Sequence, residues 1–214
     1  MRDTRAPRRH PLFARFYTRL SSAAEGKGAA EHRDHLLEGL SGTVVEVGAG
    51  NGLNFAHYPS SVTRVQAIEP EPYLRQRAEL AGAAAPVTVS VLDGSADRIP
   101  LNDATADAGV ASLVLCSVPD QSSALAELHR VIRPGGELRF YEHVLASNAR
   151  WARRQGRIDP IWTRFAGGCH LTRTTVDSIQ AAGFDVEECE EFVFSTSVFD
   201  RLAASHVLGR ARRP

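Results

Sequence analysis

Three glycines and two acids have the types and spacing of a ligand-binding turn. Gly48, Gly50 and Gly52 follow directly after the β-branched run "TVVEV", and glycines allow both a tight turn and a close approach of ligand to backbone. Glu46 precedes this loop, and Glu69 follows Gly48 by about 20 residues, where an acid binds ribose hydroxyls in nucleotide-binding folds. The sequence therefore predicts a loop that binds a cofactor containing a ribose.

Two features separate this loop from one that binds a dinucleotide. Its spacing is G-x-G-x-G, so the third glycine comes one position too early for the pyrophosphate fingerprint. Glu46 would repel phosphates but suits an ammonium or a sulfonium group. We therefore expect S-adenosylmethionine, which has no phosphate. The expected contacts in this region come from Glu46, Gly48, Ala49, Gly50, Asn51, Gly52, Glu69 and Pro70.

The elements that must position these residues alternate between short apolar runs and helical segments. Strands are expected at 43–47, 63–69, 87–92, 108–116, 137–143, 184–194 and 206–212, and helices at 51–57, 72–81, 121–131 and 174–182. This alternation predicts an α/β, Rossmann-like, mostly parallel seven-stranded sheet with helices on both faces. The last strand is expected as an antiparallel edge strand. Ligands of such sheets bind beyond the carboxyl ends of the strands.

Three segments in order resemble the class I S-adenosylmethionine-dependent methyltransferases: "VVEVGAGNG", "AIEPEP" and "RVIRPGGELRFYEHV". The segments "LVLCSVPD", "GGCHLTR" and "HVLGRA" are similar to the methyltransferase-like family that includes animal alkyl-thiol S-methyltransferases. Those enzymes carry an N-terminal membrane anchor, which we do not expect here. The resemblance implies methylation of a small molecule, with S-methylation of a thiol as the leading hypothesis.

The resemblance also implies a division of the chain. Residues 1–40 would form a tail and a helical lid, and residues 41–214 the methyltransferase domain, with a helical cap inserted at about 147–172. Tyr17 of the lid would lie near the cofactor carboxylate, although plain core packing explains it equally well. The adenine would contact Gly94, Ser95 and Ala96, and Cys116 would lie near the methyl group unless it is simply a buried small side chain.

The acceptor side is expected at the end of strand 137–143 and in the cap. His143 ends that strand and has the pKa range of a general base near neutrality; a structural histidine is the alternative. The remaining substrate-binding candidates are Trp151, Trp162, Phe165, Cys169 and His170.

Composition excludes several classes of function. Lys+Arg and Asp+Glu are both 25, so the net charge is +0 and no basic field attracts nucleic acid. No apolar run is long enough to span a membrane, and we expect a cytoplasmic protein. The three cysteines lie far apart without a CxxC pair, so neither a metal site nor a disulfide is expected. The final edge strand could mediate a homodimer.

Three alternatives stay open from sequence. The first is C- or O-methylation of a quinone or secondary metabolite. The second is an NAD-dependent oxidoreductase, which would share the sheet and Glu69. The third is a non-catalytic cofactor-binding module.

Overall fold

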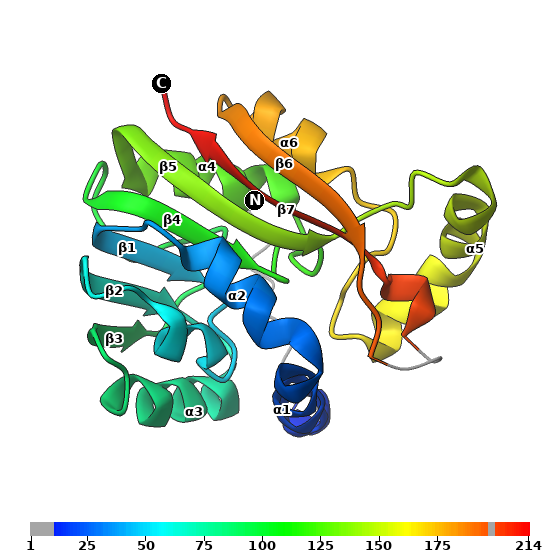
Figure 1. The fold of residues 1–214 in the computed structure, drawn as a ribbon, viewed down its shortest axis with the longest axis horizontal. Helices are drawn as coiled ribbons and strands as arrows, with labels where there is room; N and C mark the ends of the chain where they lie inside the picture. Colours follow the sequence, from blue (N-terminus) through cyan, green and yellow to red (C-terminus); the bar gives the residue numbers. More distant parts are fainter. Residues whose placement is uncertain (1–10, 197–199) are drawn as a thin grey trace, which may run out of the picture.

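The computed structural model describes residues 11–196 and 200–214. Its seven strands form one sheet in the order β3-β2-β1-β4-β5-β7-β6, shown in Figure 1. The strands are β1 (Gly42–Val47), β2 (Val62–Ile68), β3 (Thr88–Leu92), β4 (Ala106–Ser112), β5 (Ile132–His143), β6 (Asp185–Val193) and β7 (Ser205–Arg212). The first five strands are parallel to one another, and β7 pairs antiparallel with both β5 and β6.

Helices cover both faces, as the alternation predicted. The helices are α1 (Pro11–Ala24), α2 (Ala30–Leu37), α3 (Pro72–Ala83), α4 (Gln121–Val131), α5 (Ala149–Phe165) and α6 (Thr175–Ala181), and the short turns are η1 (Glu25–Ala29), η2 (Leu53–His57) and η3 (Arg201–Ala203). One core forms where α2, α3 and η2 pack on the sheet, and a second where α4 and α6 pack on it. In Figure 1, α2 crosses the near face while α4 and α6 lie behind the sheet.

The expected strand at 108–116 is shorter than its apolar sequence indicated. β4 ends at Ser112, and Leu113 has a positive φ of 56°. The next three backbone N–H groups donate to the carboxylate of Glu142 instead of to a neighbouring strand. A buried side chain thus turns the chain away from the sheet at its carboxyl edge.

Two further differences concern β5 and the sheet edge. β5 begins at Ile132 rather than at 137, because the register with β4 shifts around "RPGG" and residues on both sides of it still pair. The antiparallel edge exists, but its outermost strand is β6, and the last strand β7 lies one place inside it.

The cap of the sequence analysis corresponds to α5. It lies beyond the carboxyl edge of the sheet, beside η3 (Figure 1). Among the described residues, no helix is long and apolar enough to cross a lipid bilayer. The arginine-rich tail at residues 1–10 lies outside the described residues.

Candidate active site

The glycine loop forms the turn between β1 and η2. Gly48, Gly50 and Gly52 have φ values of 62°, 58° and 80°, a left-handed region that other residues rarely adopt. A Cβ atom on Gly48 would come within 2.3 Å of Val114, so the β1 and β4 ends approach each other only because this position lacks a side chain. The loop is therefore bare backbone facing the carboxyl edge of the sheet.

Glu69 follows the end of β2 and reaches this loop. One of its carboxylate oxygens accepts the backbone N–H of Gly50 at 2.8 Å, and the other accepts that of Glu71 at 2.9 Å. The residue is 4% exposed. Burial raises its pKa to about 7, against the lowering effect of the two backbone hydrogen bonds. Pro70 between these residues is half-buried.

Glu46 lies inside a buried polar network. Its two carboxylate oxygens accept from Asn54 Nδ2 at 2.8 Å and from the Tyr58 hydroxyl at 2.7 Å. Arg33 of α2 donates to Asn54 Oδ1 at 2.5 Å and to Glu25 at 2.9 Å. Burial raises the pKa of Glu46 to about 7, although its hydrogen bonds lower it.

Sequence reasoning missed Arg33, Asn54 and Tyr58. The only available signal was Glu46 itself, because an acid in an apolar strand requires partners. Its two donors, Asn54 and Tyr58, follow the glycine loop, and Arg33 of α2 donates to Asn54.

Tyr17 of α1 lies over the glycine loop. A Cβ on Gly50 would be 3.3 Å from its ring. Burial raises the pKa of Tyr17, and the charges of Arg33, Glu69 and Cys116 also act on it. Asn51 Nδ2 donates to Ser21 Oγ of the same helix at 3.4 Å, so the lid and the loop are joined. Two other apolar side chains of α1 are not buried: Phe16 is 60% and Leu20 53% exposed.

The loop after β3 carries the expected adenine contacts. Ala96 is buried, and Ser95 Oγ donates to Asp97 at 2.5 Å. A Cβ on Gly94 would lie 3.0 Å from Ile68 and 2.8 Å from Pro100, so this glycine lets the loop pack on the end of β2. Ala49 is buried behind the glycine loop.

Cys116, His143 and Cys169 converge although they come from three distant segments. The Cys116 and Cys169 sulfurs are 3.7 Å apart, and His143 Nδ1 lies 3.6 Å from the first and 3.7 Å from the second. The hydrogen bond between the thiols, together with burial, raises the pKa of Cys116, whereas the same bond lowers that of Cys169. Burial lowers the pKa of His143, but the hydrogen bond and charge of Cys116 outweigh it and raise the pKa overall.

The cap is fixed to the sheet by two buried polar side chains of α5. Gln155 accepts from Ala146 N at 2.8 Å and donates to the Leu202 carbonyl at 3.0 Å. Asp159 accepts from Leu171 N at 2.5 Å and pairs with His170 Nδ1 at 2.8 Å. His170 therefore holds the loop and does not join the cysteines.

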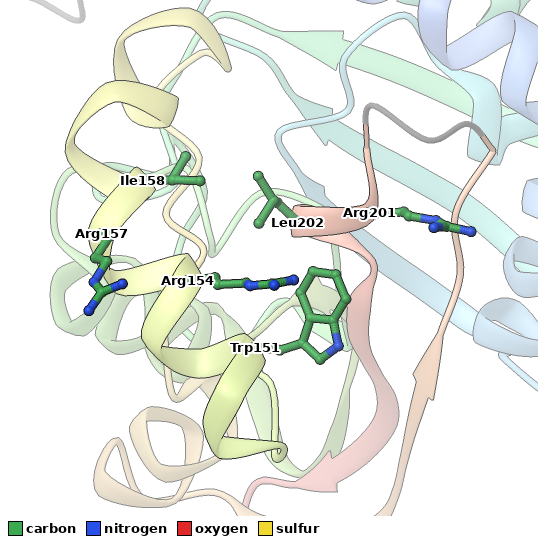
Figure 2. Close-up of a pocket in the computed structure, with 6 residues that line it drawn as sticks. All are labelled: Trp151, Arg154, Arg157, Ile158, Arg201 and Leu202. Carbon is green, nitrogen blue, oxygen red and sulfur yellow. The ribbon is translucent and has the colours of Figure 1, made fainter.

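The aromatic candidates of the cap are dispersed. Phe165 is 77% exposed, so it does not cover the acceptor region. Trp151 lines a cavity of about 470 Å³ between α5 and η3, with Arg154, Arg157, Ile158, Arg201 and Leu202. Figure 2 shows Arg154 against the indole of Trp151, at 4.9 Å from the ring centroid. By contrast, Trp162 lies close enough to Cys169 to lower its pKa.

These residues fit S-adenosylmethionine by shape and charge. Gly48, Gly50 and Gly52 present bare backbone in a left-handed conformation at the carboxyl edge, and Glu69 offers a carboxylate to ribose hydroxyls. Two buried acids, Glu46 and Glu69, favour a cationic ligand over a pyrophosphate. Arg33 is suited to the carboxylate of the methionine part.

Comparisons with known proteins show the family and the fold of this chain. The family model for a methyltransferase domain matches residues 45–140. Human thiol S-methyltransferase TMT1B is 34% identical over 160 residues, which are 72% of this chain and 65%, slightly less than two thirds, of that protein. Rat TMT1B is 31% identical over 182 residues, covering 82% of this chain and 73% of that protein. A solved S-adenosylmethionine-dependent methyltransferase from Thermotoga maritima shares the fold, with a TM-score of 0.68, 22% identity and coverage of 95% and 98%.

Proposed function

Because the chain belongs to the family of S-adenosylmethionine-dependent thiol S-methyltransferases, we propose that it methylates the sulfur of a small thiol. The position of Tyr17 carries the proposal. Its ring lies against Gly50 of the glycine loop, and Glu69 and Cys116 both act to raise its pKa, although burial is the main cause. This position supports one site that includes both the glycine loop and the cysteine–histidine cluster.

In this proposal the cofactor lies along the carboxyl ends of β1 and β2. Glu69 accepts from the ribose hydroxyls, and the loop at Gly94, Ser95 and Ala96 borders the adenine. Glu46, held by Asn54 and Tyr58, lies on the side of the cofactor's ammonium and sulfonium groups. Arg33 and Tyr17 border the methionine carboxylate. Residues 11–40 then act as a lid.

The cofactor supplies a methyl group on a sulfonium, which is already a good leaving group. The chain aligns the acceptor and excludes water, and alignment alone can lower a barrier by roughly 7–11 kcal/mol. A thiol with an ordinary pKa near ~8.5 has to lose its proton. His143 lies at the end of β5 beside Cys116, where it accepts that proton. The cap residues Trp151 and Trp162 border the acceptor.

The test is a methyl-transfer screen that reads out S-adenosylhomocysteine. We expect turnover with small thiols and little with phenols or amines. His143→Ala should reduce turnover without changing S-adenosylhomocysteine affinity. His35→Ala, on the exposed side of α2, is the control. Turnover only with phenols or carbon acids would refute the thiol assignment, and unchanged turnover in His143→Ala would remove that residue from the mechanism.

Because the chain belongs to a methyltransferase family, this proposal replaces the alternative of an NAD-dependent oxidoreductase. A non-catalytic module predicts a different result in the same screen, because it would bind S-adenosylhomocysteine and methylate none of the acceptors. A calorimetric titration with S-adenosylhomocysteine beside the screen separates this outcome from a protein that binds no cofactor.

A further inference from the structure

The cluster of Cys116, His143 and Cys169 is the set of potential metal ligands that the described residues bring together most closely. One ligand atom from each lies within 4.8 Å of the others. The residues come from the turn after β4, the end of β5 and the loop after α5. Cys116 and Cys169 are buried, and His143 is half-buried. The cluster therefore lies where three segments meet at the carboxyl edge.

The distances within the cluster match one face of a zinc tetrahedron. Zinc binds cysteine sulfur at about 2.3 Å and histidine nitrogen at about 2.0–2.1 Å, so tetrahedral angles place two sulfurs about 3.8 Å apart and sulfur about 3.6 Å from nitrogen. The observed separations are 3.7 Å between the sulfurs and 3.6 and 3.7 Å from His143 Nδ1. We propose that Cys116, His143 and Cys169 bind one Zn²⁺ ion and leave its fourth position open to the acceptor thiol.

Backbone contacts hold the two cysteines in this arrangement without help from a metal. Cys116 N donates to the buried Glu142 carboxylate at 3.0 Å. The N–H of His170 donates to the Cys116 carbonyl at 2.8 Å, which fixes Cys169 next to it. A Cβ on Gly168 would lie 2.9 Å from the Ser117 carbonyl, so glycine is needed for this close approach. The ligands are thus positioned before the ion arrives.

A buried donor also faces this cluster. The indole Nε1 of Trp162 is buried, and a hydrogen bond from this side chain lowers the pKa of Cys169. Donors around a metal site orient its ligands and tune its affinity. This N–H group would stabilise the charge of a zinc-bound Cys169 thiolate.

Ligand type and charge both favour zinc over harder ions. Thiolate and imidazole are zinc ligands, whereas magnesium and calcium prefer oxygen. Two thiolates and a neutral imidazole around a divalent ion give a centre without net charge, which a buried site accommodates well. Binding would release the two thiol protons to solvent.

The role of the ion rests on the proposed function. Three protein ligands with an open position are typical of catalytic zinc sites. The acceptor thiol would bind there as a thiolate and release its proton to solvent. Its sulfur then forms the new bond to the methyl carbon as the bond from that carbon to the sulfonium sulfur breaks, and S-adenosylhomocysteine leaves. His143 Nδ1 would act as a ligand, in place of the proton-accepting role above.

Metal binding can be measured without any methyl transfer. The full chain is purified in a reductant that keeps the cysteines as thiols, stripped with a chelator and titrated with Zn²⁺ alone and with Co²⁺ alone. We expect one ion per chain, and a sulfur-to-cobalt charge-transfer band. Cys116→Ser, Cys169→Ser and His143→Gln should each weaken zinc binding at least tenfold. Cys189→Ser, which changes the exposed cysteine of β6, should bind like the wild type.

The outcomes separate this proposal from the proposed function. Addition of a small thiol should change the cobalt spectrum, and a phenol should not; an unchanged spectrum would refute the open position. A wild-type chain that binds neither ion refutes the site, even if it methylates thiols. Binding that survives in Cys116→Ser and Cys169→Ser also refutes it. Circular dichroism of each variant shows whether lost binding reflects lost folding, and the wild-type titration decides the question if a variant does not fold.

Discussion

Glu69 should make cofactor affinity depend on pH in the neutral range. Its carboxyl group is buried, and this burial raises its pKa to about 7 in spite of hydrogen bonds from Glu71 and Gly50. The charge of Glu71 adds to the rise, and that of Arg75 opposes it. Only the ionised carboxylate can accept from two ribose hydroxyls together, so binding should require loss of this proton.

The size of the effect follows from the pKa. With a value of about 7, the apparent dissociation constant for S-adenosylhomocysteine should rise about tenfold between pH 8 and pH 6. About half a proton should be released on binding at pH 7. Glu69→Gln should flatten this profile. It should also weaken binding at pH 8 by roughly 10–100-fold, since a hydrogen bond to a charged group contributes about 1.5–3 kcal/mol.

Isothermal titration calorimetry at pH 6, 7 and 8, in two buffers of different ionisation enthalpy, measures both the dissociation constant and the number of protons released on binding. Glu79→Gln, which changes an exposed acid of α3, is the matched control. This variant should keep the wild-type pH profile. A flat wild-type profile, or a profile lost in Glu79→Gln and kept in Glu69→Gln, would refute the assignment.

Three other substitutions test the framework around the site. The raised pKa of Glu46 means that the folded state binds more protons than the unfolded state between about pH 4.5 and 7. The free energy of unfolding should therefore fall by about 3 kcal/mol as pH rises through that range. Urea unfolding at pH 5 and 8 should show that this free energy falls less in Glu46→Gln than in the wild type. Gly48→Ala should lower the midpoint of thermal unfolding and weaken S-adenosylhomocysteine binding, because its Cβ would meet Val114 at 2.3 Å and its φ of +62° disfavours alanine. An unchanged melting midpoint and an unchanged affinity would contradict this close packing. Gln155→Ala should cost about 2–3 kcal/mol of unfolding free energy, since it leaves buried backbone groups unpaired, whereas the exposed Arg153→Ala should change it little.

Local sequence patterns predicted helices and strands correctly where no contact from a distant part of the chain favoured a different structure. The helix expected at 121–131 has those bounds, because Asp120 accepts from the first-turn N–H groups and Ile132 begins the next strand. The strand expected at 108–116 ended early, because its apolar sequence could not reveal that Glu142 binds the N–H groups after Leu113. An interaction across 28 residues overrode a local preference.

The glycine loop and Glu69 could be found from sequence because they belong to consecutive strand ends, whose spacing is local. The grouping of Cys116 with Cys169 could not, because the intervening chain includes β5 and the whole of α5. Asp159 on that helix helps to decide where the loop at Cys169 lies, because it accepts from Leu171 N. His170 lies next to Cys169 in sequence, yet it faces Asp159. Proximity in sequence was therefore no guide to membership of the cluster.

The carboxyl edge of the sheet holds three acids that burial disfavours. Glu46 is 2%, Glu69 4% and Glu142 0% exposed, and burial raises the pKa of each. Backbone and side-chain donors satisfy part of each carboxylate, and cations act on two of them without a direct ion pair: Arg33 on Glu46 through Asn54, and Arg75 on Glu69. A positively charged cofactor relieves this surplus of negative charge. Binding should therefore stabilise the fold more at pH 8, where Glu46 and Glu69 are mostly ionised, than at pH 6. The rise in melting temperature on adding S-adenosylmethionine should exceed the rise on adding S-adenosylhomocysteine, which lacks the sulfonium charge, at equal saturation. Equal shifts for the two ligands would show that the buried acids do not sense the sulfonium charge.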